Sequence, residues 1–289
     1  MSFIETLETY PWIFYSSVII IGLAFGSFLN VVVYRLPLML ERDWRQQCHD
    51  FLDMTETKET SEQALSLAFP GSACPKCGHK IRFWENIPII SYVLLKGKCS
   101  GCKAPISIEY PLIELTTAIL TIAVAIHFGP SWQALAAASF TWALIALTMI
   151  DFHKQLLPDN ITLPLLWLGI LCSMFGLFVD LETSVIGAMA GYLVLWSVYH
   201  LFRLITGREG MGYGDFKLLA ALGAWMGWKM LPLIIILSSF VGAAIGLAMI
   251  ALIRHDKNIP IPFGPYLAIA GWIAFLWGDA ITSAWLGSY

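Results

Sequence analysis

Long apolar stretches alternate with short polar ones along most of the chain. Eight of them reach or approach the length that a helix needs to cross a hydrocarbon layer about 30 Å thick. They cover roughly residues 12–34, 111–128, 132–150, 161–179, 184–205, 215–228, 231–253 and 262–280. The pattern predicts an all-α polytopic membrane protein with about eight transmembrane helices, most of them joined by short loops as antiparallel hairpins.

Composition agrees with a membrane location. The 289 residues are 58% hydrophobic and 13% charged, and their mean hydropathy is +0.71. A soluble domain of this length needs far more charge to cover its surface, so the apolar excess must face lipid. The first stretch follows Glu5 and Glu8 and runs on into Tyr34-Arg35-Leu36-Pro37. It lacks the basic start and the cleavage site of a signal peptide, so we expect the chain to keep it as a span.

The basic residues predict the orientation. Ten of the 17 Lys and Arg residues fall in the segment 35–110. With the N-terminus outside, every other Lys and Arg except Lys229 also lies at a cytoplasmic helix end. Because positive charge is retained on the cytoplasmic side, we expect both termini on the outer face, which is the periplasm for a bacterial inner membrane.

Only one polar segment is long enough to form a soluble domain. The expected division is a first span at 1–34, a cytoplasmic domain at 35–110 and a seven-span membrane domain at 111–289. The highly charged part from Glu41 to Ser66 predicts one or two short surface helices. The basic residues form no stripe with interleaved aromatics, so no nucleic-acid partner is expected.

Two CxxC pairs organise the second half of this segment. Cys74 and Cys77 are separated by 21 residues from Cys99 and Cys102. Two such turns can present four thiolates to one Zn²⁺ in a tetrahedral shell, and the nearby glycines suit tight turns. A shell of four protein ligands has no open position for water, which predicts a structural zinc. The alternative is two reduced or redox-active pairs without metal. We interpret His79 as a surface or outer-shell residue.

Two aspartates stand at the ends of apolar stretches. Asp151 closes one stretch and begins the sequence DFHKQLLPD, and Asp215 follows three glycines in GMGYGDFK. Both are expected at cytoplasmic helix ends, at a depth where an ionisable group is costly and usually functional. Two carboxylates a few ångströms apart cannot both stay ionised, so one serves as an acid and the other as a base. This is the chemistry of an aspartic peptidase. The alternative is a pair of aspartates that only reach the membrane surface.

With these residues the chain resembles the type IV prepilin peptidases. The resembling segments occur in order and run nearly end to end: Gly26–Val31 with Tyr34–Pro37, the two CxxC pairs with Glu85–Pro88 between them, Gly210–Leu219, and Ile261–Pro265. The family pairs the first Asp of the segment ending in Leu-Pro-Asp with the Asp of GxGD. The resemblance therefore implies that Asp151 and Asp215 are catalytic and that Asp159 is a supporting residue.

The resemblance also implies substrates and a second activity. Such an enzyme cleaves the short basic leader from prepilins and pseudopilins at the cytoplasmic face of the bacterial inner membrane. It then methylates the new N-terminus with S-adenosylmethionine. No glycine-rich loop for this methyl donor is visible in the sequence, so its site is not assigned, and Glu85 and Asn86 are polar candidates. One departure is Glu109 before Tyr110-Pro111, where the family often has Arg.

Two other classes of protein were weighed. An ion-coupled transporter could also keep paired aspartates in its spans, but it would place them near the midplane on broken helices. A membrane scaffold with a zinc module would leave the glycine-rich segment before Asp215 without a purpose. A preflagellin-type peptidase without methyltransferase activity is expected to lack the four cysteines. The sequence does not predict the oligomeric state.

Overall fold

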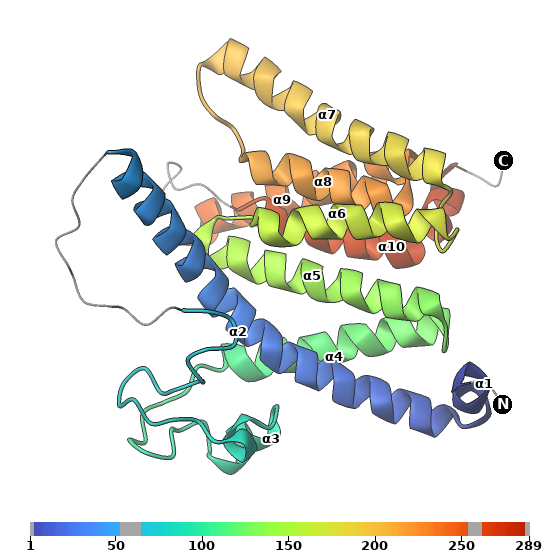
Figure 1. Cartoon of the computed structure of the whole chain (residues 1–289). Helices are drawn as coiled ribbons and strands as arrows, with labels where there is room; N and C mark the ends of the chain where they lie inside the picture. Colours follow the sequence, from blue (N-terminus) through green and yellow to red (C-terminus); the bar gives the residue numbers. More distant parts are fainter. Residues whose placement is uncertain (1–2, 53–64, 254–261, 287–289) are drawn as a thin grey trace. The chain divides into compact units, whose positions relative to one another are not determined.

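The computed structural model describes residues 3–52, 65–253 and 262–286. The chain forms two compact units, residues up to 126 and residues from 127 onward (Figure 1). The described residues form no strand. They contain only two isolated β-bridges, Ala73 with Lys80 and Lys98 with Pro105. The prediction of an all-α protein is therefore confirmed.

A helix lies at each of the eight predicted positions. The helices are α2 (Pro11–Phe51), α4 (Glu109–Phe128), α5 (Trp132–Lys154), α6 (Asp159–Met174), α7 (Leu181–Thr206), α8 (Tyr213–Met226), α9 (Leu231–Ile253) and α10 (Gly264–Leu286). In the described part of the chain, six helices are long and apolar enough to cross a membrane. The other two, α6 and α8, have 16 and 14 residues. Six candidate spans are therefore supported, and the count of eight is not confirmed.

Helix α2 differs from the prediction because it does not end near Pro37. It continues for 41 residues, so the charged segment after Glu41 extends the first span to Phe51 and does not begin a separate surface helix. Pro37 removes one backbone donor, but the Leu, Glu, Arg and Gln residues that follow favour helix. The rest of the expected surface-helix region, residues 53–64, lies outside the described residues.

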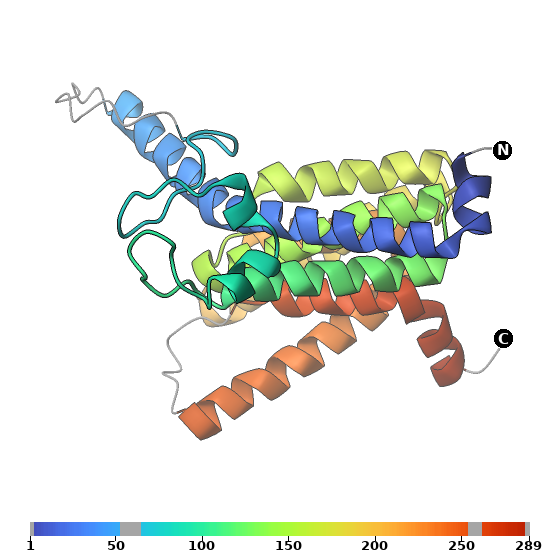
Figure 2. The ribbon, with the colours of Figure 1, turned by 90° about the horizontal axis from the view of Figure 1, so that it is seen from below.

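Two glycines let α2 approach α4 closely in the first unit. A Cβ atom on Gly26 would lie 2.6 Å from the Cα of Glu114, and one on Gly22 would lie 2.9 Å from the Cα of Ala118. Small residues of this kind allow membrane helices to pack backbone against backbone. Figure 2 shows the two helices side by side. Between them in sequence lie the short elements η1 (Phe83–Asn86) and α3 (Ile90–Leu94).

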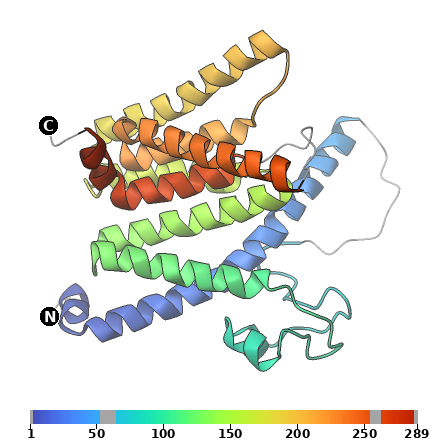
Figure 3. The same cartoon turned by 180° about the vertical axis from the view of Figure 1, so that it is seen from behind.

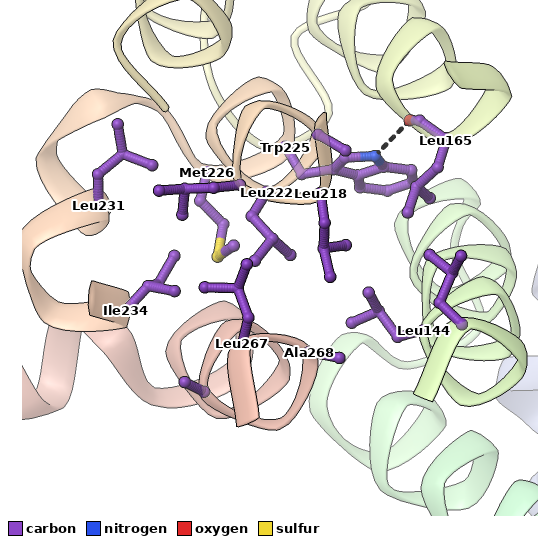
Figure 4. Close-up of a cluster of buried hydrophobic side chains, with 14 of the residues drawn as sticks. Leu144, Leu165, Leu218, Leu222, Trp225, Met226, Leu231, Ile234, Leu267 and Ala268 are labelled. Carbon is purple, nitrogen blue, oxygen red and sulfur yellow. Dashed lines mark hydrogen bonds between the residues drawn. The ribbon is translucent and has the colours of Figure 1, made fainter. Parts of the chain in front are cut away.

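Helix α8 is the centre of the second unit. Its residues from 218 to 226 are all buried. The indole of Trp225 donates a 2.9 Å hydrogen bond to the carbonyl of Leu165 on α6, within a core that also includes side chains of α5, α9 and α10 (Figure 4). On the α7 side, Ser184 donates to the carbonyl of Ala224 at 2.6 Å. Helices α9 and α10 lie on the side of α8 that faces away from α7 (Figure 3). A helix of 14 residues is stable here because protein surrounds it.

Candidate active site and metal centre

Asp151 lies in the last turn of α5, where its side chain is only 5% exposed. The helix ends at Gln155, which adopts the left-handed conformation with φ 52° and donates its N–H to the Asp151 carbonyl at 2.9 Å. The carboxylate meets the first residue of α10, because the backbone N–H of Gly264 donates to it. The sequence separates these two residues by more than 100 positions, and the fold brings them into contact.

Gly264 is the residue that permits this contact. A Cβ atom at this position would lie 2.6 Å from Oδ2 of Asp151 and 3.1 Å from Cδ2 of Leu157. The first distance is closer than real Cβ atoms come to a carboxylate oxygen, so any larger residue must displace Asp151 or the start of α10. Gly264 belongs to Ile261–Pro265, one of the segments that resemble the type IV prepilin peptidases, but the sequence suggested no role for it.

If Asp151 is catalytic, as the resemblance implies, Gly264→Ala should lower leader cleavage about a hundredfold, because a displacement of about 1 Å at a catalytic group has an effect of this size. Cleavage rates of purified protein in detergent measure it. Gly71→Ala is the matched control, since a Cβ atom there meets nothing within 4 Å. Unchanged cleavage in Gly264→Ala would contradict the close contact with Asp151.

Asp215 lies in the first turn of α8 and is 6% exposed. Gly212 precedes the helix, and its carbonyl accepts the N–H of Asp215 at 3.3 Å. A Cβ atom on Gly214 would lie 2.7 Å from the Cβ of Leu157, and one on Gly210 would lie 2.9 Å from a ring carbon of Phe202. These two glycines therefore allow neighbouring segments to approach closely.

The two aspartates share one buried site. The negative charge of Asp151 acts electrostatically on the carboxyl group of Asp215. The end of α5 and the starts of α8 and α10 together supply the two carboxyl groups and the N–H of Gly264. Two nearly buried carboxyl groups that repel each other do not readily both hold a negative charge, so this arrangement favours one proton on the pair.

Asp159 has a different environment. It is exposed at the start of α6, where both of its carboxylate oxygens lie 2.7 Å from Nζ of Lys217 on α8. Lys217 follows Asp215 by two residues, so this ion pair ties the start of α6 to the turn that carries Asp215. The geometry suits the supporting role that the sequence suggested for Asp159.

In the first unit, the four cysteines of the two CxxC pairs form one cluster. All four sulfur atoms lie within 4.8 Å of one another. The Cys74–Cys102 and Cys77–Cys99 distances are 3.9 and 4.0 Å. Tetrahedral zinc with Zn–S bonds of about 2.3 Å places its sulfurs about 3.8 Å apart. The donor set and its spacing therefore fit one zinc ion.

The two pairs are held by turns of the same design. In the first turn, the Cys74 N–H donates to the carbonyl of His79 and the Gly78 N–H donates to the carbonyl of Cys74, both at 2.9 Å. In the second, the Cys99 N–H donates to Ala104 at 2.9 Å and the Lys103 N–H donates to Cys99 at 3.0 Å. Each turn carries its two thiols on the inside of a short backbone loop.

The glycines of the two turns have different roles. Gly78 has the positive φ, 71°, that a tight turn requires, as expected. In the second turn the corresponding residue is Lys103, with φ 58°, and not the glycine inside the pair. Gly101 has another reason to be small, because a Cβ atom there would lie 3.2 Å from the Cβ of His79.

The electrostatics of the cluster favour a cation. The backbone N–H groups of Lys76 and Cys77 lower the pKa of the Cys74 thiol to about 6, which gives the thiolate that zinc binds. The backbone N–H of His79 acts in the same direction on Cys77, but the sulfurs of Cys102 and Cys74 outweigh it and raise the pKa of Cys77 to about 12. Four crowded sulfurs can all be thiolates only when a cation compensates their charge.

His79 connects the two turns from outside the sulfur shell, as predicted. Its Nε2 lies 2.9 Å from the hydroxyl of Ser100 and 3.2 Å from Oε2 of Glu85. The backbone N–H of Arg82, together with Ser100 and His79, lowers the pKa of Glu85 to about 2. Because this carboxylate is already bound, Glu85 is a poor candidate for the methyl-donor site.

Both halves of the chain match known protein families. Residues 20–128 match the bacterial peptidase A24 N-terminal domain, and residues 138–247 match the type IV leader peptidase family. The chain is 56% identical to the prepilin leader peptidase/N-methyltransferase of Stutzerimonas stutzeri over 99% of its own length and 98% of the relative. Identity to the proteins of the same name is 55% in Pseudomonas aeruginosa, over the same shares, and 43% in Legionella pneumophila, over 96% of both chains.

No solved structure matches the chain. The curated relatives are nonetheless collinear with it from end to end, and none of those named above is a transporter. The resemblance suggested by the cysteine pairs and the aspartate segments is thus confirmed. The chain belongs to the type IV leader peptidase family, in the branch whose members carry the bacterial A24 N-terminal domain.

Proposed function

We propose that this protein is an aspartic endopeptidase that removes the leader from prepilins and pseudopilins, with Asp151 and Asp215 as its catalytic pair. The observation that carries the proposal is the presence of two nearly buried, electrostatically interacting carboxyl groups at helix ends of one unit. The relatives' names supply the substrate class and a second activity, N-methylation.

The geometry supports separate roles for the two aspartates. The N–H of Gly264 donates to Asp151 at the positive end of α10, which suits the carboxylate that accepts a proton from the attacking water. Asp215 then donates a proton to the carbonyl oxygen of the scissile peptide. A water held between them attacks the carbonyl carbon and forms a diol. When the C–N bond breaks, the proton gained by Asp151 passes to the leaving amine, and a hydroxyl proton of the diol returns to Asp215. No covalent intermediate is needed.

The cysteine cluster supports a structural zinc held by Cys74, Cys77, Cys99 and Cys102. Its four-sulfur shell would close two backbone turns into one folded unit. S-adenosylmethionine is the methyl donor implied by the relatives' names, and we assign no residue to it. One assay separates the two activities: a purified prepilin is incubated with the protein, with and without S-adenosylmethionine. Cleavage should occur in both samples, and methylation of the new N-terminus only in the first.

We propose a multi-pass location in the bacterial inner membrane, with both termini periplasmic and the aspartates at the cytoplasmic ends of their helices. The basic residues support this orientation. A prepilin would then place its apolar helix among the lipids and its basic leader in the cytoplasm. Its scissile bond would reach the headgroup boundary, where Asp151 and Asp215 are placed.

Cysteine labelling is expected to verify the orientation. Single cysteines in place of Lys154 and Glu209, both exposed near the aspartates, should react with an impermeant thiol reagent only from the cytoplasmic side. A cysteine in place of Glu182, exposed at the opposite end of α7, should react only from outside. The parent protein, with its own cysteines, gives the background. Labelling of positions 154 and 209 from opposite sides would rule out a shared active site.

A further inference from the structure

The elements between the two cysteine pairs expose large apolar side chains. On α3 the side chains of Val93 and Leu94 are 65% and 76% exposed, and Ile90 is also exposed. Residues three and four positions apart lie on one side of a helix, so these three form a single apolar face. We name it the α3 face. Exposed apolar groups of this size in a polar segment mark a binding surface.

Aromatic and basic groups extend this surface. In η1, directly before α3, Phe83 is 80% exposed and Trp84 is exposed beside it. The guanidinium carbon of Arg82 lies 5.4 Å from the centre of a Trp84 ring. Aromatic rings with a neighbouring cation are typical of the boundary between lipid and water.

The charge of the whole segment has one sign. Residues 65–108 include six Lys and Arg residues and a single acidic residue, Glu85. The carboxylate of Glu85 is held by the Arg82 N–H and by His79. The net charge of the segment that carries the α3 face is therefore positive, which complements anionic headgroups.

A hydrogen bond fixes the level of α3 relative to the membrane helices of its own unit. The N–H of Ile89, which precedes α3, donates at 2.8 Å to the carboxylate of Glu114. Glu114 is buried in the second turn of α4, where Ser27 of α2 also bonds it. Figures 1 and 3 show α3 beside the first turns of α4. Because α4 is a candidate span that begins at Glu109, α3 lies where this helix enters the bilayer.

The backbone at this point is strained. Ile89 has φ 60°, a conformation that is a genuine outlier for a β-branched residue. The bond to Glu114 holds the strained residue in place. Strain of this kind persists only where the surroundings over-determine it, and it is concentrated at functional positions.

We infer that α3 and η1 form a membrane-surface anchor that inserts its apolar face shallowly among anionic lipids next to α4. Lipid fits the surface better than a protein partner does. The α3 face lies at the entry level of a span, and the exposed rings of Phe83 and Trp84 in η1 have a neighbouring cation, Arg82, as segments at a membrane interface do. This role goes beyond leader cleavage and methylation, and it does not depend on either activity.

Photocrosslinking in the full-length protein tests the inference. Leu94 is replaced by p-benzoylphenylalanine, and the protein is placed in nanodiscs of phosphatidylethanolamine and phosphatidylglycerol. The matched control carries the same amino acid at Lys76, which is exposed in the first cysteine turn among polar groups. After irradiation, mass spectrometry of the peptides should find lipid adducts at position 94 at least several-fold more often than at position 76. Zinc content measured on both variants reports whether the segment has folded.

The adduct should depend on lipid charge and on the contact with Glu114. Nanodiscs without phosphatidylglycerol should lower the yield at position 94 several-fold. Glu114→Gln should also lower it, and Ile89→Gly in that background should restore part of it, because glycine adopts the positive φ without strain. Equal lipid adducts at positions 94 and 76 would overturn the inference. So would crosslinks from position 94 to a second copy, to another part of the chain or to an added prepilin in place of lipid.

Discussion

Asp151→Asn and Asp215→Asn are each expected to lower leader cleavage by at least about a thousandfold, the scale on which an acid–base unit fails when one member is removed. An amide cannot take the water's proton or supply one to the peptide carbonyl. Either change therefore leaves the pair without its base or without its acid. The measurement is the single-turnover rate on a purified prepilin. Because asparagine is nearly isosteric with aspartate, both variants should insert and purify like the parent protein.

Asp159→Asn is the matched comparison for this experiment. Asp159 is exposed, and its ion pair with Lys217 is worth no more than about 1 kcal/mol in such a setting. The variant should therefore keep most of the parent's cleavage rate. If Asp159→Asn were as inactive as Asp151→Asn, the choice of Asp151 over Asp159 as the catalytic aspartate would no longer be justified. Near-normal cleavage by Asp151→Asn or by Asp215→Asn would contradict the proposed mechanism.

The second large effect concerns metal. Purified protein should carry about one zinc ion per chain, since four thiolates saturate one tetrahedral ion. Replacing Cys74 and Cys77 together with serine should remove the zinc, as measured by elemental analysis. Binding and folding are coupled in such sites, so limited proteolysis should then cut between residues 65 and 108. Cys48→Ser is the control, because this exposed cysteine is not in the cluster.

A metal-free preparation with the parent's protease resistance would show that the cysteines serve another purpose. A loss of zinc without new proteolytic cuts would mean that other contacts already hold the segment. The bond between Ile89 and Glu114 and the bond between Arg35 and the Ser66 carbonyl, 2.9 Å long, are the contacts to examine in that case.

Hydropathy and spacing predicted the helices and the cysteine cluster, because each depends on a local pattern. Apolar length marks a span, and two CxxC pairs need only a turn each. The contacts that complete the site are not local. Nothing around Gly264 in the sequence indicates that its missing side chain makes room for a carboxylate of another helix, and nothing around Ile89 predicts a bond to Glu114.

The extension of α2 to Phe51 was missed for another reason. The pattern of a charged segment after an apolar one predicted that the helix ends before Glu41. In the structure the same helix continues through the charged residues to Phe51. The shortness of α6 and α8 was only partly foreseen. Apolar residues in flanking loops lengthened α6 in the prediction, which placed its end at 179 while the helix ends at Met174.

The shortness of α8 has a consequence for hydration. Its 14 residues span about 21 Å, which is less than the hydrocarbon thickness of about 30 Å. Lipid does not have to thin around this helix, because α6, α7, α9 and α10 contact it and its residues from 218 to 226 are buried. The turn that carries Asp215 can therefore lie below the level of the headgroups with protein around it. Water and an extended polar peptide can then reach the carboxyl groups without crossing lipid tails.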